Sequence, residues 1–248
     1  GKEPTYVMRN AVITDPAISI PAGDGNWQDT AYYTFPNDAT LYSAFPHAHY
    51  RAVSTSLEIM YPDGRREMLL ALPHYDFNWQ GAYVFEKPID IPAGSKLIAH
   101  YTYDNSKRNP ANPDPTINVR WSEQSYGEMF YMSFAYLWKG ETAAHRVNYE
   151  QALNASAAFG RMDKNVSGKI ELSEASTAIK PLFSMFDRNG DGGLDTTELA
   201  AAQGGAGGRG APGGRGAPAP ANQAGAPAPA ASATQRSPEA SNGARPQG

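Results

Sequence analysis

The chain contains no cysteine among its 248 residues. Disulfide bonds are therefore excluded, and so is any metal site built from thiolate ligands. The sequence also lacks an apolar run near the roughly 20 residues that a membrane-spanning helix needs. Its formal net charge of -4 is too small to indicate nucleic-acid binding. We therefore expect no membrane span and no nucleic acid as a partner.

The last 45 residues, 204–248, contain no aromatic residue and no Leu, Ile or Val. Because 11 of them are Gly, 13 Ala and 7 Pro, this segment cannot bury a core, and we predict a disordered tail. Four arginines and Glu239 give the tail a charge of +3, which leaves -7 on residues 1–203. The Gly-Gly-Arg-Gly repeats could contact RNA or an acidic surface, but a solvated linker is the simpler interpretation.

The first 140 residues are rich in short segments typical of β-strands. Residues 6–14 form one such segment, and residues 54–61 and 66–72 predict a hairpin around Pro62-Asp63-Gly64. Ile-Pro-Ala-Gly occurs at 20–23 and again at 91–94, and we interpret both copies as type I turns. Frequent strands, aromatic residues and regular turns predict an antiparallel β-sandwich over residues 1–140.

Residues 129–136 alternate in a way that predicts one buried strand face. The even positions are Phe130, Met132, Phe134 and Tyr136, whereas the odd positions begin with Met129 and are less apolar. Met129 is therefore expected on the more open side of this strand. The alternative for any methionine is a role as core filler, which we assign to Met132.

His47 and His49 are two residues apart in an extended segment, so both imidazoles are expected on the same side of a strand. Two imidazoles with the thioether of Met129 form a borderline-to-soft donor set that suits copper better than zinc or magnesium. A His-x-His pair alone is weak evidence, because solvated or packed histidines produce the same pattern.

Further motifs follow in a fixed order along the chain. They are Pro46–Arg51, Pro73–Gln80, Tyr103–Ser106, Asn109–Pro113 and the pair Glu128-Met129. With them, residues 41–138 resemble the C-terminal copper domain of the copper type II, ascorbate-dependent monooxygenases, and most closely its bacterial members. The resemblance departs at Ala52, where bacterial members usually carry Gly.

The resemblance implies a jelly-roll sandwich in which His47, His49 and Met129 bind copper. It implies that O2 is activated there to hydroxylate a small-molecule or peptide substrate, with electrons from ascorbate or another redox domain. The resembled enzymes use a second copper, held by three histidines in a preceding domain, whereas only about 40 residues precede the matched segment here. The alternative is a copper-holding or adhesive module without oxygenase chemistry, tuned by calcium.

Three histidines remain outside this set, and their spacing does not form a three-histidine site. We expect His74 to have a structural role beside the copper site and His100 to be a hydrogen-bonded core residue, with a site-lining role as its alternative. His145 is expected to be exposed. The sequence begins with Gly1 and has no signal peptide, so we expect a fragment or a processed form. We expect an extracytoplasmic location, periplasmic or secreted.

Residues 149–203 change in character and predict a small α-helical module with two calcium-binding EF-hand loops. Each loop has oxygen donors at positions 1, 3, 5, 9 and 12, a carbonyl at 7 and Gly at 6. Loop one, residues 163–174, offers Asp163, Asn165, Ser167, Lys169, Glu171 and Glu174. Loop two, residues 187–198, offers Asp187, Asn189, Asp191, Gly193, Asp195 and Glu198.

The position-8 residues, Ile170 and Leu194, are expected to join the two loops through a short β-bridge. Only residues 175–186 separate the loops, so the helices between them must be very short. Loop one has three carboxylates against four in loop two, and we expect it to bind calcium more weakly. We expect calcium to fold residues 149–203 and to leave the sandwich almost unaffected. Acidic surface loops that fit the pattern by chance are the alternative.

Overall fold

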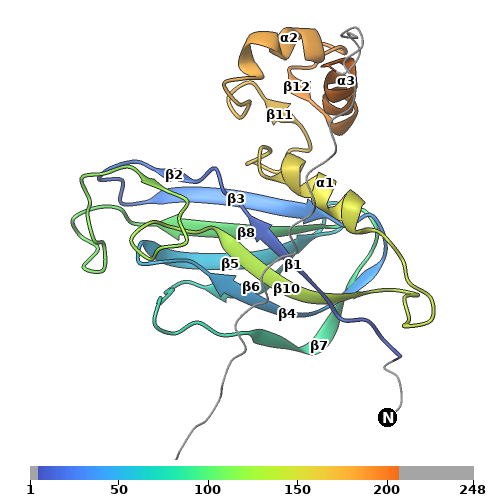
Figure 1. The fold of residues 1–248 in the computed structure, drawn as a ribbon, viewed down its shortest axis with the longest axis horizontal. Coiled ribbons are helices and arrows are strands. Elements are labelled where there is room, and N and C mark those ends of the chain that lie inside the picture. The colour runs from blue at the N-terminus through green and yellow to red at the C-terminus, as the bar shows by residue number, and fades with distance from the viewer. Residues whose placement is uncertain (1–4, 207–248) are drawn as a thin grey trace, which may run out of the picture. The chain divides into compact units, whose positions relative to one another are not determined.

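The computed structural model of the chain describes residues 5–206 (Figure 1). Residues 204–206 belong to the end of the last helix. The rest of the predicted disordered tail lies outside the described residues. Within the described part, no helix is long and apolar enough to cross a membrane.

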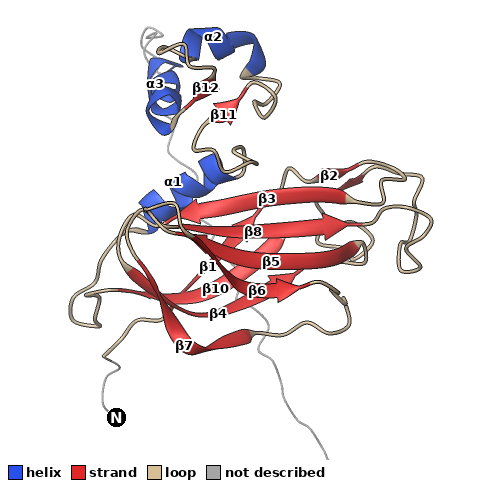
Figure 2. Cartoon of the chain, turned by 180° about the vertical axis from the view of Figure 1, so that it is seen from behind, coloured by secondary structure: helices blue, strands red, loops and turns tan. Residues whose placement is uncertain are grey.

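Two antiparallel sheets of four strands each form the larger part of the fold (Figure 2). One sheet has the order β1 (Arg9–Thr14), β10 (Tyr131–Trp138), β4 (Ala39–His47) and β7 (Tyr83–Ile91). The other has the order β3 (Trp27–Thr34), β8 (Lys96–Tyr103), β5 (Ala52–Met60) and β6 (Arg66–Leu72). The short strands β2 (Ser19–Ile20) and β9 (Val119–Arg120) pair separately.

The first and last long strands, β1 and β10, are neighbours in one sheet although about 120 residues separate them. Chain-consecutive strands such as β3 and β4 lie in different sheets, so the chain repeatedly crosses between the layers. Eight strands in two sheets with this order form a jelly roll. The predicted mainly β, jelly-roll-like sandwich is confirmed.

Side chains of β10 show why the sandwich holds together. Met132, Phe134, Tyr136 and Trp138 are buried, which confirms the predicted alternation. Phe35 contacts three of these rings, at centroid separations of 5.7 to 6.0 Å. Burial of large aromatic surfaces of this kind is a main source of stability in such a core.

The predicted turns lie where expected, but their form differs. The hairpin of β5 and β6 is confirmed, whereas the strand expected over residues 6–14 begins only at Arg9.

In the two Ile-Pro-Ala-Gly turns, the bonds run from Asp24 N to Pro21 O (3.3 Å) and from Ser95 N to Pro92 O (3.0 Å). Each glycine therefore occupies the third turn position. Its φ is +73° at Gly23 and +85° at Gly94, as a type II turn requires.

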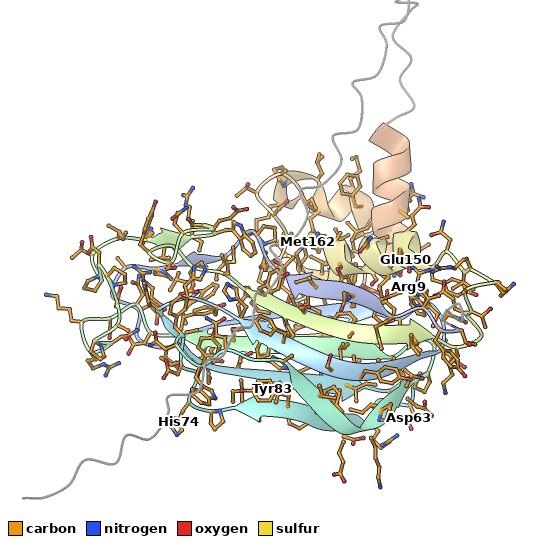
Figure 3. All side chains as sticks on the ribbon, turned by 60° about the horizontal axis from the view of Figure 1, so that its bottom comes forward. Arg9, Asp63, His74, Tyr83, Glu150 and Met162 are labelled. Carbon is orange, nitrogen blue, oxygen red and sulfur yellow. The ribbon has the colours of Figure 1, made fainter. Side chains whose placement is uncertain are left out.

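Helix α1 (Glu150–Gly160) lies against the edge strand β3. The hydroxyl of Ser156 lies 3.0 Å from the backbone N of Thr34 and 3.1 Å from its carbonyl O. At Gly160 a Cβ would meet the carbonyl O of Tyr32 at 2.1 Å, so only glycine permits this approach. The first turn of α1 is further held by an ion pair of 2.5 Å between Arg9 and Glu150 (Figure 3).

The EF-hand module predicted over residues 149–203 begins with α1, and further elements follow it. They are β11 (Ile170–Glu171), the 3-10 helix η1 (Lys180–Leu182), α2 (Phe183–Phe186), β12 (Gly193–Leu194) and α3 (Thr196–Ala206). Ile170 pairs with Leu194, so the predicted bridge between the loops is confirmed. The predicted shortness of the intervening helices is confirmed as well, because α2 has only four residues.

Candidate metal centres

His47 and His49 lie together at one end of the sandwich. β4 ends at His47, and His49 follows it in the segment that leads to β5. The two rings are nearly perpendicular, with centroids 5.1 Å apart. His47 is partly exposed, whereas His49 is only 3% exposed. The two imidazoles thus converge, although His49 lies beyond the end of the strand.

The backbone of Met129 lies near that of His49 because both follow directly from the paired ends of β4 and β10. His47 pairs with Tyr131 in this antiparallel ladder, so a continuation by two residues would set His49 opposite Met129. The carboxyl group of Glu128 connects the two segments there. Its Oε1 accepts the backbone N–H groups of both His49 and Met129, and its Oε2 accepts that of Arg51 at 3.0 Å. One buried carboxyl group therefore holds both segments in place.

Glu128 is fully buried. Burial raises the pKa of its carboxyl group from 4.5 to about 7, although the three backbone N–H groups and Arg51 act in the opposite direction. The resemblance points to the Glu-Met pair, but sequence alone does not reveal that this carboxyl group binds backbone amides.

Gln80 and Tyr75, both from the segment 73–80, orient the histidine segment. Gln80 Oε1 lies 2.6 Å from Nδ1 of His47. The amide nitrogen of Gln80 donates to the carbonyl of Phe77 at 2.7 Å, which fixes the orientation of the amide. Nδ1 of His47 therefore carries the proton and Nε2 remains for a ligand. The Tyr75 hydroxyl bonds both the backbone N and O of Ala48, at 2.8 and 2.9 Å.

The ring of His49 offers a buried nitrogen to a ligand. Its Nδ1 is buried and has no hydrogen-bond partner among residues 5–206. A buried polar atom of this kind is costly unless something satisfies it. Burial first, and then the nearby His47, lower the pKa of His49, which favours the neutral imidazole that metals bind. Together with the thioether of Met129, these nitrogens fit copper as a soft-to-borderline ion.

The other three histidines do not join this group. His74 is exposed at the surface (Figure 3), so the segment 73–80 contacts the pair through Tyr75 and Gln80 instead. His100 is only partly buried and lies between Thr30 (2.9 Å) and the carboxylate of Glu58 (3.0 Å). It is hydrogen-bonded as expected, but on an outer sheet face rather than in the core. His145 is exposed, as expected.

Within residues 5–206, no three His, Asp or Glu side chains gather closely enough to hold a metal ion by themselves. A metal centre in this part of the chain therefore needs other donors. A thioether would complete the pair His47 and His49. Amide, hydroxyl and carbonyl oxygens would complete the carboxylates of the two EF-hand loops, which is the usual composition of such loops.

The two loops share one backbone form. Positions 4 and 6 both have positive φ, at Val166 (60°) and Gly168 (88°) in loop one and at Gly190 (70°) and Gly192 (82°) in loop two. A β-branched residue rarely adopts this conformation, so Val166 is strained where loop two has glycine. Val166 is nevertheless buried, and its packing in the core of the module offsets the strain.

The carboxylates at positions 1 and 12 close each loop. Asp163 accepts the backbone N–H groups of Ser167 and Gly168, both at 2.8 Å. Asp187 accepts those of Asp191 (3.2 Å) and Gly192 (3.0 Å). The position-12 glutamates also accept three backbone N–H groups each. These come from Lys164, Asn165 and Glu171 to Glu174, and from Arg188, Asn189 and Asp195 to Glu198.

Two lysines of loop one make contacts that the loop pattern does not reveal. Lys169 Nζ lies 2.6 Å from Asp191 Oδ2 at position 5 of loop two, and its stem lies across Gly193. Lys164 reaches two buried aspartates of the sandwich, Asp15 and Asp29. Lysine at positions 2 and 7 carries no sequence signal for such contacts, since position 7 contributes only its carbonyl to calcium.

Comparison with known proteins identifies one part of the chain. A family model described as EF hand matches residues 179–201, which include all of loop two. This part of the chain is similar to an EF hand, and the match supports calcium binding. No curated protein matches the chain. The family match gives no support to a copper monooxygenase domain.

Several solved structures of infectious bursal disease virus match at low similarity. The structure of the Gx strain has 13% identity and a TM-score of 0.25, and the match covers 81% of this chain and 54% of that one. The VP2 subviral particle has 14% identity and a TM-score of 0.24, with coverages of 79% and 53%. The Gt strain has 13% identity and a TM-score of 0.19, with coverages of 79% and 54%. The chain spans about half the length of these viral chains, and scores this low carry no argument about function.

Proposed function

We propose that the sandwich binds one copper ion through His47, His49 and Met129, and that the module after it binds calcium in loops one and two. The observation that carries the copper proposal is the convergence at Glu128. A single carboxyl oxygen accepts the backbone N–H groups of His49 and Met129, while the buried Nδ1 of His49 has no partner in the described residues. The two segments are thus fixed in advance, which lowers the cost of binding an ion between them.

Copper held by these residues would supply one-electron redox chemistry for the activation of O2. The contribution of the protein is to hold His47 through Gln80, to keep His49 neutral by burial and to leave one side open at the partly exposed His47. We propose a monooxygenase-like oxidoreductase acting on a small molecule or peptide. Its electrons would come from ascorbate or from another redox domain, and its location would be extracytoplasmic.

Extended X-ray absorption on the Cu(I) form of the full chain tests the ligand set. Nitrogen neighbours and one sulfur are expected, and without cysteine that sulfur must belong to a methionine. Met129→Leu should remove the sulfur signal. Met68→Leu is the matched control, because Met68 is 54% exposed on β6, outside the proposed site, and the sulfur should persist. A sulfur signal that survives Met129→Leu would refute the assignment.

A second candidate is a copper-holding module without oxygenase chemistry. One observation favours it: His74, His100 and His145 lie in separate surroundings and do not form a second nitrogen cluster in residues 5–206. The resembled hydroxylases deliver two electrons through two coppers. We therefore expect the isolated 248-residue chain to show little turnover of peptidylglycine or phenethylamine substrates with ascorbate. Ascorbate-dependent O2 consumption in the presence of copper separates the two candidates.

A further inference from the structure

We propose that calcium loop one is completed by the sandwich: Tyr32 of β3 is a positioning residue for Asp163, so that calcium binding and sandwich stability are linked. The inference rests on the proposed calcium binding of loop one. It replaces the expectation that calcium leaves the sandwich almost unaffected.

The first contact is a buried hydrogen bond. The Tyr32 hydroxyl donates to Oδ2 of Asp163 at 2.6 Å, and the two residues are 1% and 0% exposed. Asp163 occupies position 1 of loop one and also accepts two backbone N–H groups of the loop. With these three donors its carboxylate is fixed in direction before an ion arrives. A preorganised ligand of this kind binds more tightly than one that must be ordered on binding.

The second contact is made by the next residue, Lys164. Its ammonium group lies 2.6 Å from Asp15 Oδ2 and 2.5 Å from Asp29 Oδ1, and both carboxylates are buried in the sandwich. It also donates to the carbonyl of Thr30 at 3.2 Å. The Lys164 side chain is 36% exposed, but both carboxylates are buried, so loss of its ammonium group would leave them without a compensating charge. Position 2 of the loop is therefore also bonded to the sandwich.

The third contact is apolar. Tyr32 and Ile98 of the sandwich share one buried cluster with Phe159, Val166 and Ile170 of the module. Gly160 brings the end of α1 directly onto the backbone of Tyr32. Loop one thus enters from a helix that is fixed on β3 and starts with two residues that are bonded to the sandwich.

Loop two provides an internal comparison. Asp187, its position-1 carboxylate, is partly exposed and accepts backbone N–H groups of its own loop. Its contact with loop one runs through the Ile170–Leu194 bridge and Lys169. Calcium in loop one is therefore expected to act on the sandwich directly, and calcium in loop two only through the first loop.

Thermodynamic linkage gives the consequence. A ligand that binds only the folded state stabilises it, and the coupling is reciprocal. If an intact sandwich improves calcium binding in loop one, then calcium in loop one must raise the unfolding temperature of the sandwich. The isolated module, without Tyr32, would lose this part of its affinity.

Calorimetric titration of the full chain with calcium tests the role of Tyr32. Tyr32→Phe removes the hydroxyl and should weaken one of two sites by roughly tenfold, as loss of a ligand's supporting partner commonly does. Tyr33→Phe is the matched control on the same strand, since its hydroxyl donates to the carbonyl of Val12, away from the loops. Both sites should be unchanged in the control. Two sites of unaltered affinity in Tyr32→Phe would overturn the proposal while leaving calcium binding intact.

Thermal unfolding, followed by near-ultraviolet circular dichroism of the sandwich aromatics, gives an independent readout that leaves Tyr32 unchanged. Calcium should raise the melting temperature of the unmodified chain. Glu174→Gln in loop one should remove most of this rise, whereas Glu198→Gln in loop two should retain most of it. A sandwich transition that calcium does not move would refute the linkage. Failure of the unmodified chain to bind any calcium would refute the underlying function as well.

Discussion

Gln80 Oε1 accepts the Nδ1 proton of His47 at 2.6 Å and thereby fixes which ring nitrogen of His47 faces outward. Gln80→Leu removes this acceptor but keeps a side chain of similar size. Copper affinity should fall by about 10- to 100-fold, because the loss of a partner that orients a ligand has effects of this order. Competition with a chromophoric Cu(I) chelator measures the change.

The matched control is Gln28→Leu, an exposed position on β3. Copper affinity should be unaltered there, and both variants should keep the circular dichroism spectrum of the unmodified chain. Equal affinity in Gln80→Leu and Gln28→Leu would show that His47 needs no such partner, or is not a ligand.

Glu128→Gln should change how the free energy of unfolding depends on pH. The pKa of Glu128 is raised from 4.5 to about 7, so between these values the folded chain holds a proton that the unfolded chain has released. The free energy of unfolding of the unmodified chain therefore falls as pH rises through this window, by at most on the order of 3 kcal/mol from this group. The side-chain amide of the variant does not titrate, so the advantage of the unmodified chain over the variant should be larger at pH 5 than at pH 8.

Glu141→Gln provides a control of opposite sign. The hydrogen bond from Arg9 lowers the pKa of Glu141, so the stability that this carboxylate adds is lost as pH falls below its ordinary pKa of 4.5. Urea denaturation at pH 4, 5 and 8 measures both variants. A difference between the unmodified chain and Glu128→Gln that does not vary with pH would contradict the assigned shift.

Lys169→Met should strengthen calcium binding in loop two. The ammonium group of Lys169 lies against Asp191, a predicted ligand, and competes there with the ion. Methionine keeps the apolar stem that lies across Gly193 but removes the charge. We expect an affinity gain of a few-fold in loop two, and a smaller gain at high salt, where the competing ion pair is already screened. Calorimetry at two salt concentrations distinguishes this from a general change in the module.

The ranking of the two loops is tested at position 12. Loop two has four carboxylates and the unstrained Gly190 at position 4, whereas loop one has three and the strained Val166. Loop two should therefore fill first, and Glu198→Gln should abolish the tighter step of the titration. Glu174→Gln should affect only the weaker step. Equal losses in the two variants would contradict this order.

Much of the fold follows from local patterns. The alternation around Phe130 and Met132 predicts the buried face of β10 because side chains on a strand alternate. Ile170 and Leu194 each stand at position 8 of a loop, and this matched spacing predicts the bridge between them. The turn at Ile20–Gly23 is predicted in place but not in type. Pro21 is the first residue of the turn and not the second as predicted. Its position in the turn depends on which residues of the flanking strands pair.

The long-range contacts of the candidate sites are not predictable from the sequence. Glu128 accepts N–H groups from residues about 80 positions away, and the side chain gives no sign that backbone amides surround it. Tyr32, Asp15 and Asp29 are ordinary residue types on or beside early strands. Only the jelly-roll order and the position of α1 bring them to Asp163 and Lys164. Single-sequence patterns contain no information on such pairings.

The contact of Ser156 with both the N and O of Thr34 also bears on how the chain avoids self-association. β3 is an edge strand, and an uncovered edge offers its free backbone groups to any other extended chain. Ser156 occupies these groups at Thr34, and α1 lies over the strand. The helix that leads into the first calcium loop thus also covers an edge strand of the sheet. A sandwich truncated before Tyr149 would expose this edge and could pair through it with other copies of itself.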